Sequence, residues 1–213
     1  GAHADNNIDI QEFMIVPCGF STFREALRAG CEVYHTLGKL LRAAGKSVGV
    51  GDEGGFAPDM RDNSEVLSML RDAVENAGYT TEQIRFAMDA ASSEWTEGDS
   101  KYTLPKAGGT MDSVDLIGVY ESLAERFPIL SLEDGLGEDD NSGWKSMTER
   151  LGKEMLLVGD DFFVTNPAKL QKGIERGLAN AILVKPNQIG TLTETMEVVR
   201  MAKNAGYHTI LSH

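Results

Sequence analysis

The sequence predicts an α/β fold built as an incomplete (β/α) barrel, with about six of the eight strands of a closed barrel of this kind. Two observations predict it. Short apolar runs recur along the 213 residues, and each ends at an ionisable residue, a pattern that favours buried strands. The intervals between these endings leave room for a loop, a helix and the next strand. The runs are 86–89, 129–133, 155–161, 181–185 and 209–213.

Parallel strands that alternate with helices place their carboxyl ends on one side of the sheet. The residues that close the five runs are therefore expected to converge on one mouth, which is where the active sites of (β/α) barrels lie. These residues are Asp89, Glu133, Asp160, Lys185 and His213.

Composition excludes several classes of protein. With 20 basic and 33 acidic residues the net charge is −13, which argues against a general binder of nucleic acid or of anionic membranes. A mouth lined by carboxylates would bind an anionic substrate only if metal ions first inverted the local field. Cys18 and Cys31 lack metal-ligand spacing and are typical of a reduced, cytosolic protein. No apolar run reaches the length of a membrane span and no signal peptide opens the chain, so we expect a cytoplasmic location.

Upstream of the first closed run, the sequence predicts one more strand and two helices. Residues 8–16 alternate imperfectly and are predicted to form the strand, with Gln11 and Glu12 inside it. A carboxylate there is either a paired core charge or a group that points into the mouth. Apolar positions three and four residues apart predict amphipathic helices over 21–41 and 64–77. Two successive helices depart from strict βα alternation.

The connection between these helices, residues 45–63, is rich in glycine. Its matches to the dinucleotide-binding pattern G-x-G-x-x-G are Gly49, Gly51 and Gly54. We reject a dinucleotide site because the pattern follows a helix and because Asp52 and Glu53 place negative charge where a pyrophosphate would lie. The connection is predicted to be a functional loop that presents these two carboxylates. The alternative is a solvated turn with incidental acids.

In the second half of the chain, the polar stretch 98–109 is predicted to be a surface hairpin or loop. Helices are predicted over 113–127, 144–151, 167–178 and 192–205 from their apolar spacing and their caps. The acidic run at 138–140 is typical of a solvated helix start.

The closing residues also suggest a chemistry. Asp89, Glu133 and Asp160, without sulfur, form an oxygen-rich set that suits Mg²⁺ or Mn²⁺ rather than Zn²⁺. Lys185, facing a mouth filled by a dication, would be pushed towards its neutral form and could act as a base. The alternative is a lysine that simply pairs with Asp160 or Glu133. Glu53 could then donate a proton from the opposite side, as the elimination of water from a hydroxy acid requires.

The chain resembles the enolase family, the phosphopyruvate hydratases of glycolysis. The resemblance spans the whole chain in family order and implies an enolase-type barrel, whose first connection is irregular. The matching stretches are Ala4-Asp-Asn-Asn, Ile8-Asp-Ile-Gln-Glu-Phe-Met-Ile, Gly51-Asp-Glu-Gly-Gly-Phe-Ala-Pro, Ala87-Met-Asp, Ser131-Leu-Glu-Asp-Gly, Val158-Gly-Asp-Asp-Phe-Phe-Val-Thr-Asn, Lys185-Pro-Asn-Gln-Ile-Gly-Thr-Leu-Thr-Glu-Thr and Ser212-His213.

The resemblance implies a lyase that catalyses the reversible, Mg²⁺-dependent dehydration of 2-phospho-D-glycerate to phosphoenolpyruvate. By the same resemblance, Lys185 matches the base that removes the C2 proton and Glu53 the acid that assists departure of the C3 hydroxyl. The residues that match ligands of Mg²⁺ are Asp89, Glu133 and Asp160, the last of these rather than Asp161. The residues that match positions around the substrate are His3, Gln11, Glu12 and His213.

The resemblance also carries expectations about the whole protein. Residues 1–213 would be part of the catalytic barrel domain, with an N-terminal capping domain and the last barrel segment outside them, so this stretch alone is expected to be inactive or nearly so. Members of the family usually form homodimers or larger homo-oligomers, and some have a secondary cell-surface or secreted pool. Two alternatives are a related enzyme acting on another carboxylate and a non-catalytic role, such as binding plasminogen or an RNA-degrading complex. The retained site residues argue against the non-catalytic role.

Overall fold

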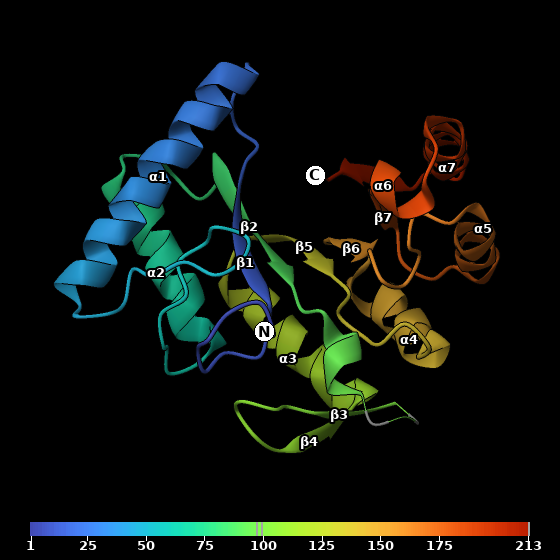
Figure 1. Ribbon diagram of the computed structural model, residues 1–213, viewed down its shortest axis with the longest axis horizontal. Coiled ribbons are helices and arrows are strands. Elements are labelled where there is room, and N and C mark those ends of the chain that lie inside the picture. The colour runs from blue at the N-terminus through green and yellow to red at the C-terminus, as the bar shows by residue number, and fades with distance from the viewer. Residues whose placement is uncertain (97, 99, 213) are drawn as a thin grey trace. The chain divides into compact units, whose positions relative to one another are not determined.

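The computed structural model describes residues 1–96, 98 and 100–212. Helices and strands alternate along most of the chain, which confirms the predicted α/β class (Figure 1). Among the described residues, no helix has the length and apolar character needed to cross a membrane. The elements are β1 (Glu12–Pro17), α1 (Phe23–Ala43), α2 (Asn63–Asn76), β2 (Ile84–Asp89), the 3₁₀ helix η1 (Ser92–Trp95), β3 (Lys101–Thr103), β4 (Thr110–Asp112), α3 (Ser113–Arg126), β5 (Ile129–Glu133), α4 (Asn141–Leu151), β6 (Leu156–Gly159), α5 (Pro167–Arg176), β7 (Ala181–Val184), α6 (Pro186–Ile189), α7 (Leu192–Asn204) and β8 (His208–Leu211).

The chain divides into two compact units. The first consists of Gly1–Asp89, Pro105–Gly108 and Ser122–Leu130, and the second of Ala90–Leu104, Gly109–Glu121 and Ser131–His213. Strands are hydrogen-bonded in the order β1-β2-β5-β6-β7-β8. The step from β2 to β5 lies inside the first unit, where the Phe86 amide donates to the Pro128 carbonyl at 3.0 Å. Six strands in this sheet agree with the predicted number.

In the first unit, β1 pairs with β2 in the antiparallel sense, and Glu12 lies opposite Asp89. The start of β1 therefore lies at the same edge as the end of β2. Helices α1 and α2 pack against each other beside this pair (Figure 1). The two helices between β1 and β2 are the irregular first connection that the family resemblance implied. The strand predicted over 8–16 begins only at Glu12.

The strand prediction was wrong at its start because burial there does not come from sheet pairing. Ile8 and Ile10 are buried, but residues 9–11 form bends. Their apolar side chains alternate with Asp9, whose carboxylate accepts hydrogen bonds from the Lys106 and Ala107 amides. The bent segment 8–11 thus has the alternating apolar and polar pattern of a strand without being one.

In the second unit, β5, β6, β7 and β8 form a parallel ladder, as predicted. One or two helices lie between each strand and the next: α4 after β5, α5 after β6, and α6 and α7 after β7. Val158, Ala181 and Leu183 form a buried cluster on this ladder. The strand predicted over 155–161 is shorter, because the chain turns at Asp160, whose carbonyl accepts hydrogen bonds from the amides of Phe163 and Val164.

The polar stretch after η1 forms the hairpin β3–β4, one of the two forms predicted for it. One of its side chains is not a surface group: Tyr102 is fully buried, and its hydroxyl donates to Asp140 Oδ2 at 2.8 Å. Asp140 is also the N-cap of α4 and accepts from the Gly143 amide. The prediction of a solvated helix start at 138–140 was therefore wrong for Asp140, which is only 7% exposed, because it binds the hairpin and the helix together.

Candidate active site

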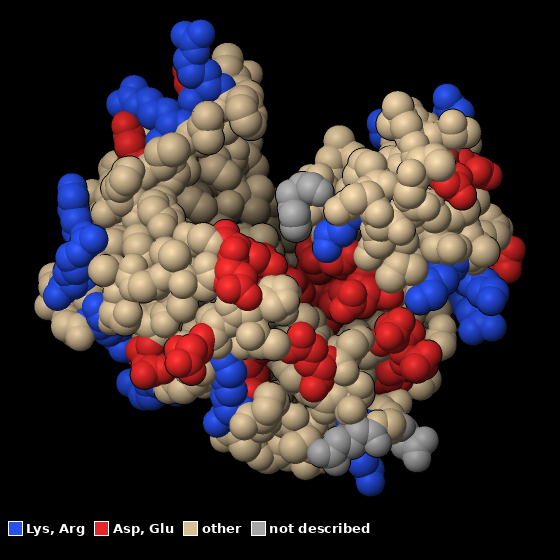
Figure 2. Space-filling model, viewed as in Figure 1, with Lys and Arg blue, Asp and Glu red and all other residues tan. Residues whose placement is uncertain are grey.

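Three of the predicted site residues lie at the carboxyl ends of successive parallel strands of the second unit. Glu133 is the last residue of β5, while Asp160 and Lys185 directly follow β6 and β7. Lys185 Nζ lies 2.5 Å from Asp160 Oδ2. Figure 2 shows carboxylates gathered on the face over these strand ends. The structure thus brings Asp160 and Lys185 into direct contact, which is the ion pair that the sequence left open as the alternative to a catalytic base.

The charge state of Lys185 follows from its surroundings. Partial burial lowers the pKa of this amine, but the hydrogen bond to Asp160 and the charges of Asp160, Glu133 and Asp161 together raise it above its ordinary value. The carboxylates alone therefore favour the ammonium form. The neutral lysine expected from the sequence requires a cation that offsets their charge.

Asp134 is a site residue that the sequence analysis missed. Its side chain is buried, with 2% exposure, and its backbone has a positive φ of 40°. Oδ1 accepts from the Asp160 amide at 3.1 Å and Oδ2 from the Asp161 amide at 2.7 Å. The available signal was its position directly after a strand that already ends in Glu133, since such a carboxylate can reach the loop of the neighbouring strand.

Asp134, Asp160 and Asp161 each offer one carboxylate oxygen, and these oxygens lie within 4.8 Å of one another. An all-oxygen donor set of this kind suits Mg²⁺ or Mn²⁺. Burial and the charges of Asp160 and Glu138 raise the pKa of Asp161, although Lys185 opposes this shift. A cation held here would relieve that excess of negative charge, so the residues fit the metal that the sequence predicted. The cluster differs from the predicted ligand set, with which it shares only Asp160.

Thr165 is the second residue that the sequence analysis missed. It is fully buried, and its hydroxyl oxygen accepts from the Lys185 amide at 2.9 Å. The same hydroxyl lies 2.9 Å from Gln188 Oε1, to which it can donate. Val164 and Thr165 have positive φ angles of 46° and 52°, so a strained turn after β6 carries the hydroxyl to the backbone of Lys185.

In the first unit, four of the predicted residues form two pairs. Asp89, the last residue of β2, is 7% exposed, and its Oδ2 accepts from Gln11 Nε2 at 3.0 Å. His3 Nδ1 lies 2.9 Å from Glu53 Oε1. Glu53 itself is exposed. Of the two remaining predicted substrate residues, Glu12 begins β1 opposite Asp89, and His213 lies outside the described residues.

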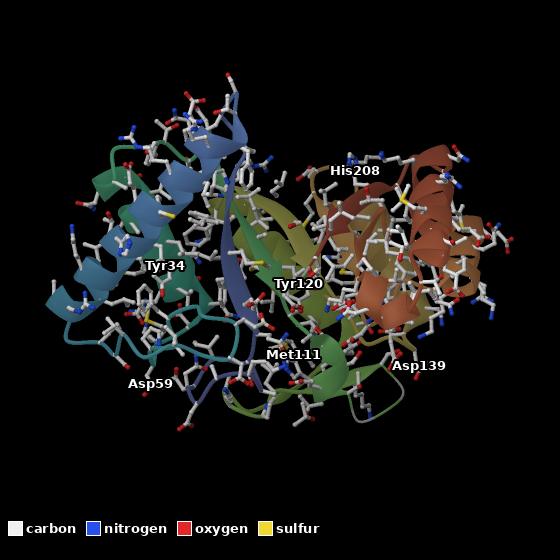
Figure 3. All side chains as sticks on the ribbon, turned by 45° about the horizontal axis from the view of Figure 1, so that its top comes forward. Tyr34, Asp59, Met111, Tyr120, Asp139 and His208 are labelled. Atoms are coloured by element: carbon white, nitrogen blue, oxygen red, sulfur yellow. The ribbon has the colours of Figure 1, made fainter. Side chains whose placement is uncertain are left out.

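The glycine-rich loop holds Glu53 by contacts on both sides of it. The Asp52 amide donates to the His3 carbonyl at 3.1 Å. Tyr34 lies on α1 (Figure 3), and its hydroxyl donates to the Gly54 carbonyl at 3.1 Å. The Tyr34 ring stacks on Phe56 with centroids 4.5 Å apart. The loop is closed by a bridge between Val50 and Phe56 and does not open a helix, in keeping with the rejection of a dinucleotide site.

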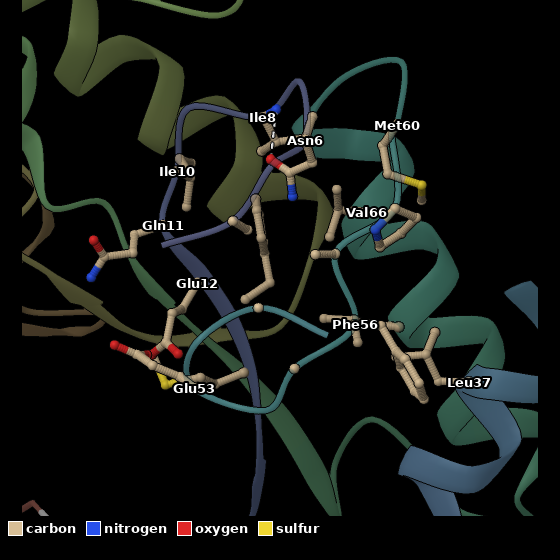
Figure 4. Close-up of a pocket in the computed structure, with 18 of the residues that line it drawn as sticks. Asn6, Ile8, Ile10, Gln11, Glu12, Leu37, Glu53, Phe56, Met60 and Val66 are labelled. Carbon is tan, nitrogen blue, oxygen red and sulfur yellow. Dashed lines mark hydrogen bonds between the residues drawn. The ribbon is translucent and has the colours of Figure 1, made fainter. Parts of the chain in front are cut away.

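A cavity of about 380 Å³ lies in the first unit, beside this loop. Figure 4 shows Glu12 and Glu53 together at one end of it, with Leu37, Phe56 and Val66 at the other. The carboxylates at the polar end would repel a phosphorylated acid, so this end suits such a ligand only when a cation offsets their charge. The apolar end is a loosely filled part of the core between α1, α2 and β1.

Comparison with known protein families agrees with this arrangement. Residues 1–213 match the family described as Enolase, C-terminal TIM barrel domain. The match covers the strands that carry Asp89, Glu133, Asp160 and Lys185 as well as the loop that carries Glu53. The chain therefore belongs to the enolase family, through its C-terminal TIM barrel domain.

Proposed function

We propose that the chain is the catalytic barrel part of an enolase, which converts 2-phospho-D-glycerate reversibly into phosphoenolpyruvate in glycolysis. The observation that carries the proposal is the pairing of Lys185 with Asp160 at the ends of β6 and β7, in a chain of the enolase family. An amine among carboxylates at strand ends is the arrangement that a lysine base beside a metal ion requires. A lysine base beside one or two Mg²⁺ ions is characteristic of the enolase superfamily.

In this proposal Lys185 removes the proton from C2 of the substrate. It can accept a proton only as a free amine, so the carboxylate charge that raises its pKa must be offset first. Glu53 acts as the acid that assists departure of the C3 hydroxyl, and His3 beside it is placed to fix the orientation of its carboxyl group. His3, Gln11, Glu12 and His213 are proposed to contact the substrate.

Asp89, Glu133 and Asp160 are proposed to hold Mg²⁺. When bound, Mg²⁺ would offset the charge of the substrate carboxylate and the further charge that develops as the C2 proton leaves. The Gln11 amide already donates to Asp89, and such a hydrogen bond would orient that carboxylate towards a ligand position.

The same proposal places the protein in the cytoplasm as a homo-oligomer that exchanges only small phosphorylated acids with its surroundings. It rests on the family and on the retained acid and base. A non-catalytic role as the main function is disfavoured because a chain released from catalysis need not retain Lys185 and Glu53.

The proposal is tested with Lys185→Ala in the full protein. General base catalysis contributes about 10²- to 10⁴-fold, so exchange of the C2 proton of 2-phosphoglycerate with D₂O, followed by NMR, should fall by at least that factor while Mg²⁺ still binds. The matched control is Lys169→Ala, which removes an exposed lysine paired with Glu138 at 3.3 Å and should leave exchange unchanged. Proton exchange in Lys185→Ala at the wild-type rate would refute the assignment of the base.

A further inference from the structure

The buried side chain of Asp134 joins the loops after β5 and β6. Its own amide donates to the Val158 carbonyl at 3.0 Å, and its carbonyl accepts from the Ser92 amide at 3.1 Å. The backbone of Asp134 is thus tied both to β6 and to the start of η1. Its left-handed φ of 40° is a conformation that Asp tolerates better than most residues.

From this fixed backbone the carboxylate reaches the first two amides of the turn after β6. Both oxygens are used, one for Asp160 at 3.1 Å and one for Asp161 at 2.7 Å. Two hydrogen bonds to one carboxylate fix the orientation of the turn as well as its distance from Asp134. The direction in which the Asp160 side chain leaves the backbone is therefore set by Asp134.

We propose that Asp134 is a positioning residue for the metal site, which acts by holding the Asp160 backbone so that the Asp160 carboxylate faces Lys185 and the cation. The consequence for metal binding rests on the function proposed above. The hydrogen bonds themselves do not, because they are part of the folded chain.

Two other roles for Asp134 make different predictions. As a direct metal ligand it would have to share oxygens that already accept backbone amides. As a mere source of negative charge it would raise cation affinity by no more than its neighbour Asp161, whose carboxylate is in the same cluster. A comparison of variants at these two positions separates positioning from charge.

The experiment compares Asp134→Asn with Asp161→Asn in the full protein. Asn keeps the shape of Asp134, tolerates a left-handed backbone and can still accept the Asp160 amide, but its NH₂ group cannot accept the Asp161 amide. Asp161→Asn removes one charge from the same cluster and leaves both hydrogen bonds from Asp134 in place. Binding is measured by titration with Mn²⁺ as the probe, and backbone exchange at residues 160 and 161 by NMR in metal-free buffer.

The proposal expects Asp134→Asn to weaken Mn²⁺ binding about 10- to 100-fold, the range for a group that orients a metal ligand, and clearly more than Asp161→Asn does. It also expects faster amide exchange at 160 and 161 in Asp134→Asn only. Equal Mn²⁺ affinities of the two variants, or unchanged amide exchange, would overturn it. Asp134→Glu, which keeps the charge but displaces the acceptors, should also lose affinity, and it replaces Asp134→Asn if that variant does not fold.

The two proposals fail in distinguishable ways. If the wild-type protein binds no Mn²⁺, the metal-dependent function is wrong, whereas the role of Asp134 in holding the turn is still decided by the exchange of the two amides. If wild type binds Mn²⁺ and Asp134→Asn binds it equally well, the positioning role is wrong and the proposed function stands.

Discussion

Removing the carboxylate of Asp140 should destabilise the second unit by about 3 kcal/mol or more. Asp140 accepts from the Tyr102 hydroxyl at 2.8 Å, from the Ser113 hydroxyl at 2.5 Å and, as the N-cap of α4, from the Gly143 amide at 2.9 Å. In Asp140→Ala the lost cap costs about 1 kcal/mol. Each of the two hydroxyls that loses its acceptor in the interior adds about 1 to 3 kcal/mol.

The free energy of unfolding is measured by urea denaturation followed by far-ultraviolet circular dichroism. Asp139→Ala is the matched control, since this exposed neighbour lies outside the network and its loss should change stability by less than about 0.5 kcal/mol. An Asp140→Ala variant within 1 kcal/mol of wild type would show that the hydroxyls find other partners, and would refute the reasoning.

The same carboxylate makes the stability depend on pH. Burial raises the pKa of Asp140, but the hydrogen bonds from Ser113, the Gly143 amide and Tyr102 outweigh it, and the net pKa is lowered. Because the folded pKa lies below the unfolded value of about 3.9, this stabilisation is fully present above pH 4 and is lost as pH falls through the folded pKa. The stability difference between wild type and Asp140→Asn should therefore shrink below pH 4, and a constant difference would contradict the shift.

Four further substitutions test hydrogen bonding at Thr165 and packing at two glycines. Thr165→Val leaves the Lys185 amide without its acceptor and should cost about 1 to 3 kcal/mol in urea denaturation. Thr165→Ser keeps the hydroxyl and should lose less stability, and a loss equal to that of Thr165→Val would contradict the assignment to the hydrogen bond. Gly173→Ala places a Cβ 2.5 Å from Phe163 and should lower stability by about 1 to 3 kcal/mol through overpacking. In α3, Gly118 has open space around it, so Gly118→Ala should raise stability by about 0.4 to 1 kcal/mol, and a loss there equal to that of Gly173→Ala would contradict the packing argument.

The sequence predicted the parallel part of the fold well because its signal is local. A short apolar run that ends at a charge marks both a buried strand and the edge where it stops, as at Glu133 and Lys185. The signal fails where burial has another origin. Ile8 and Ile10 are buried by a bend rather than a strand, and Tyr102 is one buried aromatic residue in a polar hairpin, so only the folded chain reveals its partner Asp140.

In the candidate site, contacts between strand ends could be predicted from the sequence, whereas contacts to loop amides could not. The proximity of Asp160 and Lys185 could be predicted because parallel strands place their carboxyl ends side by side. In the structure the two side chains are in contact. The contacts of Asp134 and Thr165 could not be predicted, because their side chains accept hydrogen bonds from backbone amides of other loops. Such a role depends on where those amides point, and no spacing in the sequence records it.

Backbone strain is distributed in a way that links the predicted chemistry to the fold. Of the six described residues other than glycine with positive φ angles, four lie near the predicted site: Ala91, two residues after Asp89; Asp134, directly after Glu133; and Val164 and Thr165, in the turn that Asp160 opens. The other two, Ser100 and Ala179, lie before β3 and before β7. Each such residue costs on the order of 1 to 3 kcal/mol and persists only where its surroundings over-determine it.

For Asp134 and Thr165 those surroundings are visible, since both side chains are buried and both accept backbone amides. A glycine at either position would relieve the strain, but it would remove the acceptor of those amides. The two side chains that hold the strained backbone in the loops after β5 and β6 therefore also fix the backbone of Asp160 and of Lys185. This is what a site that must hold a cation and a base at set distances requires.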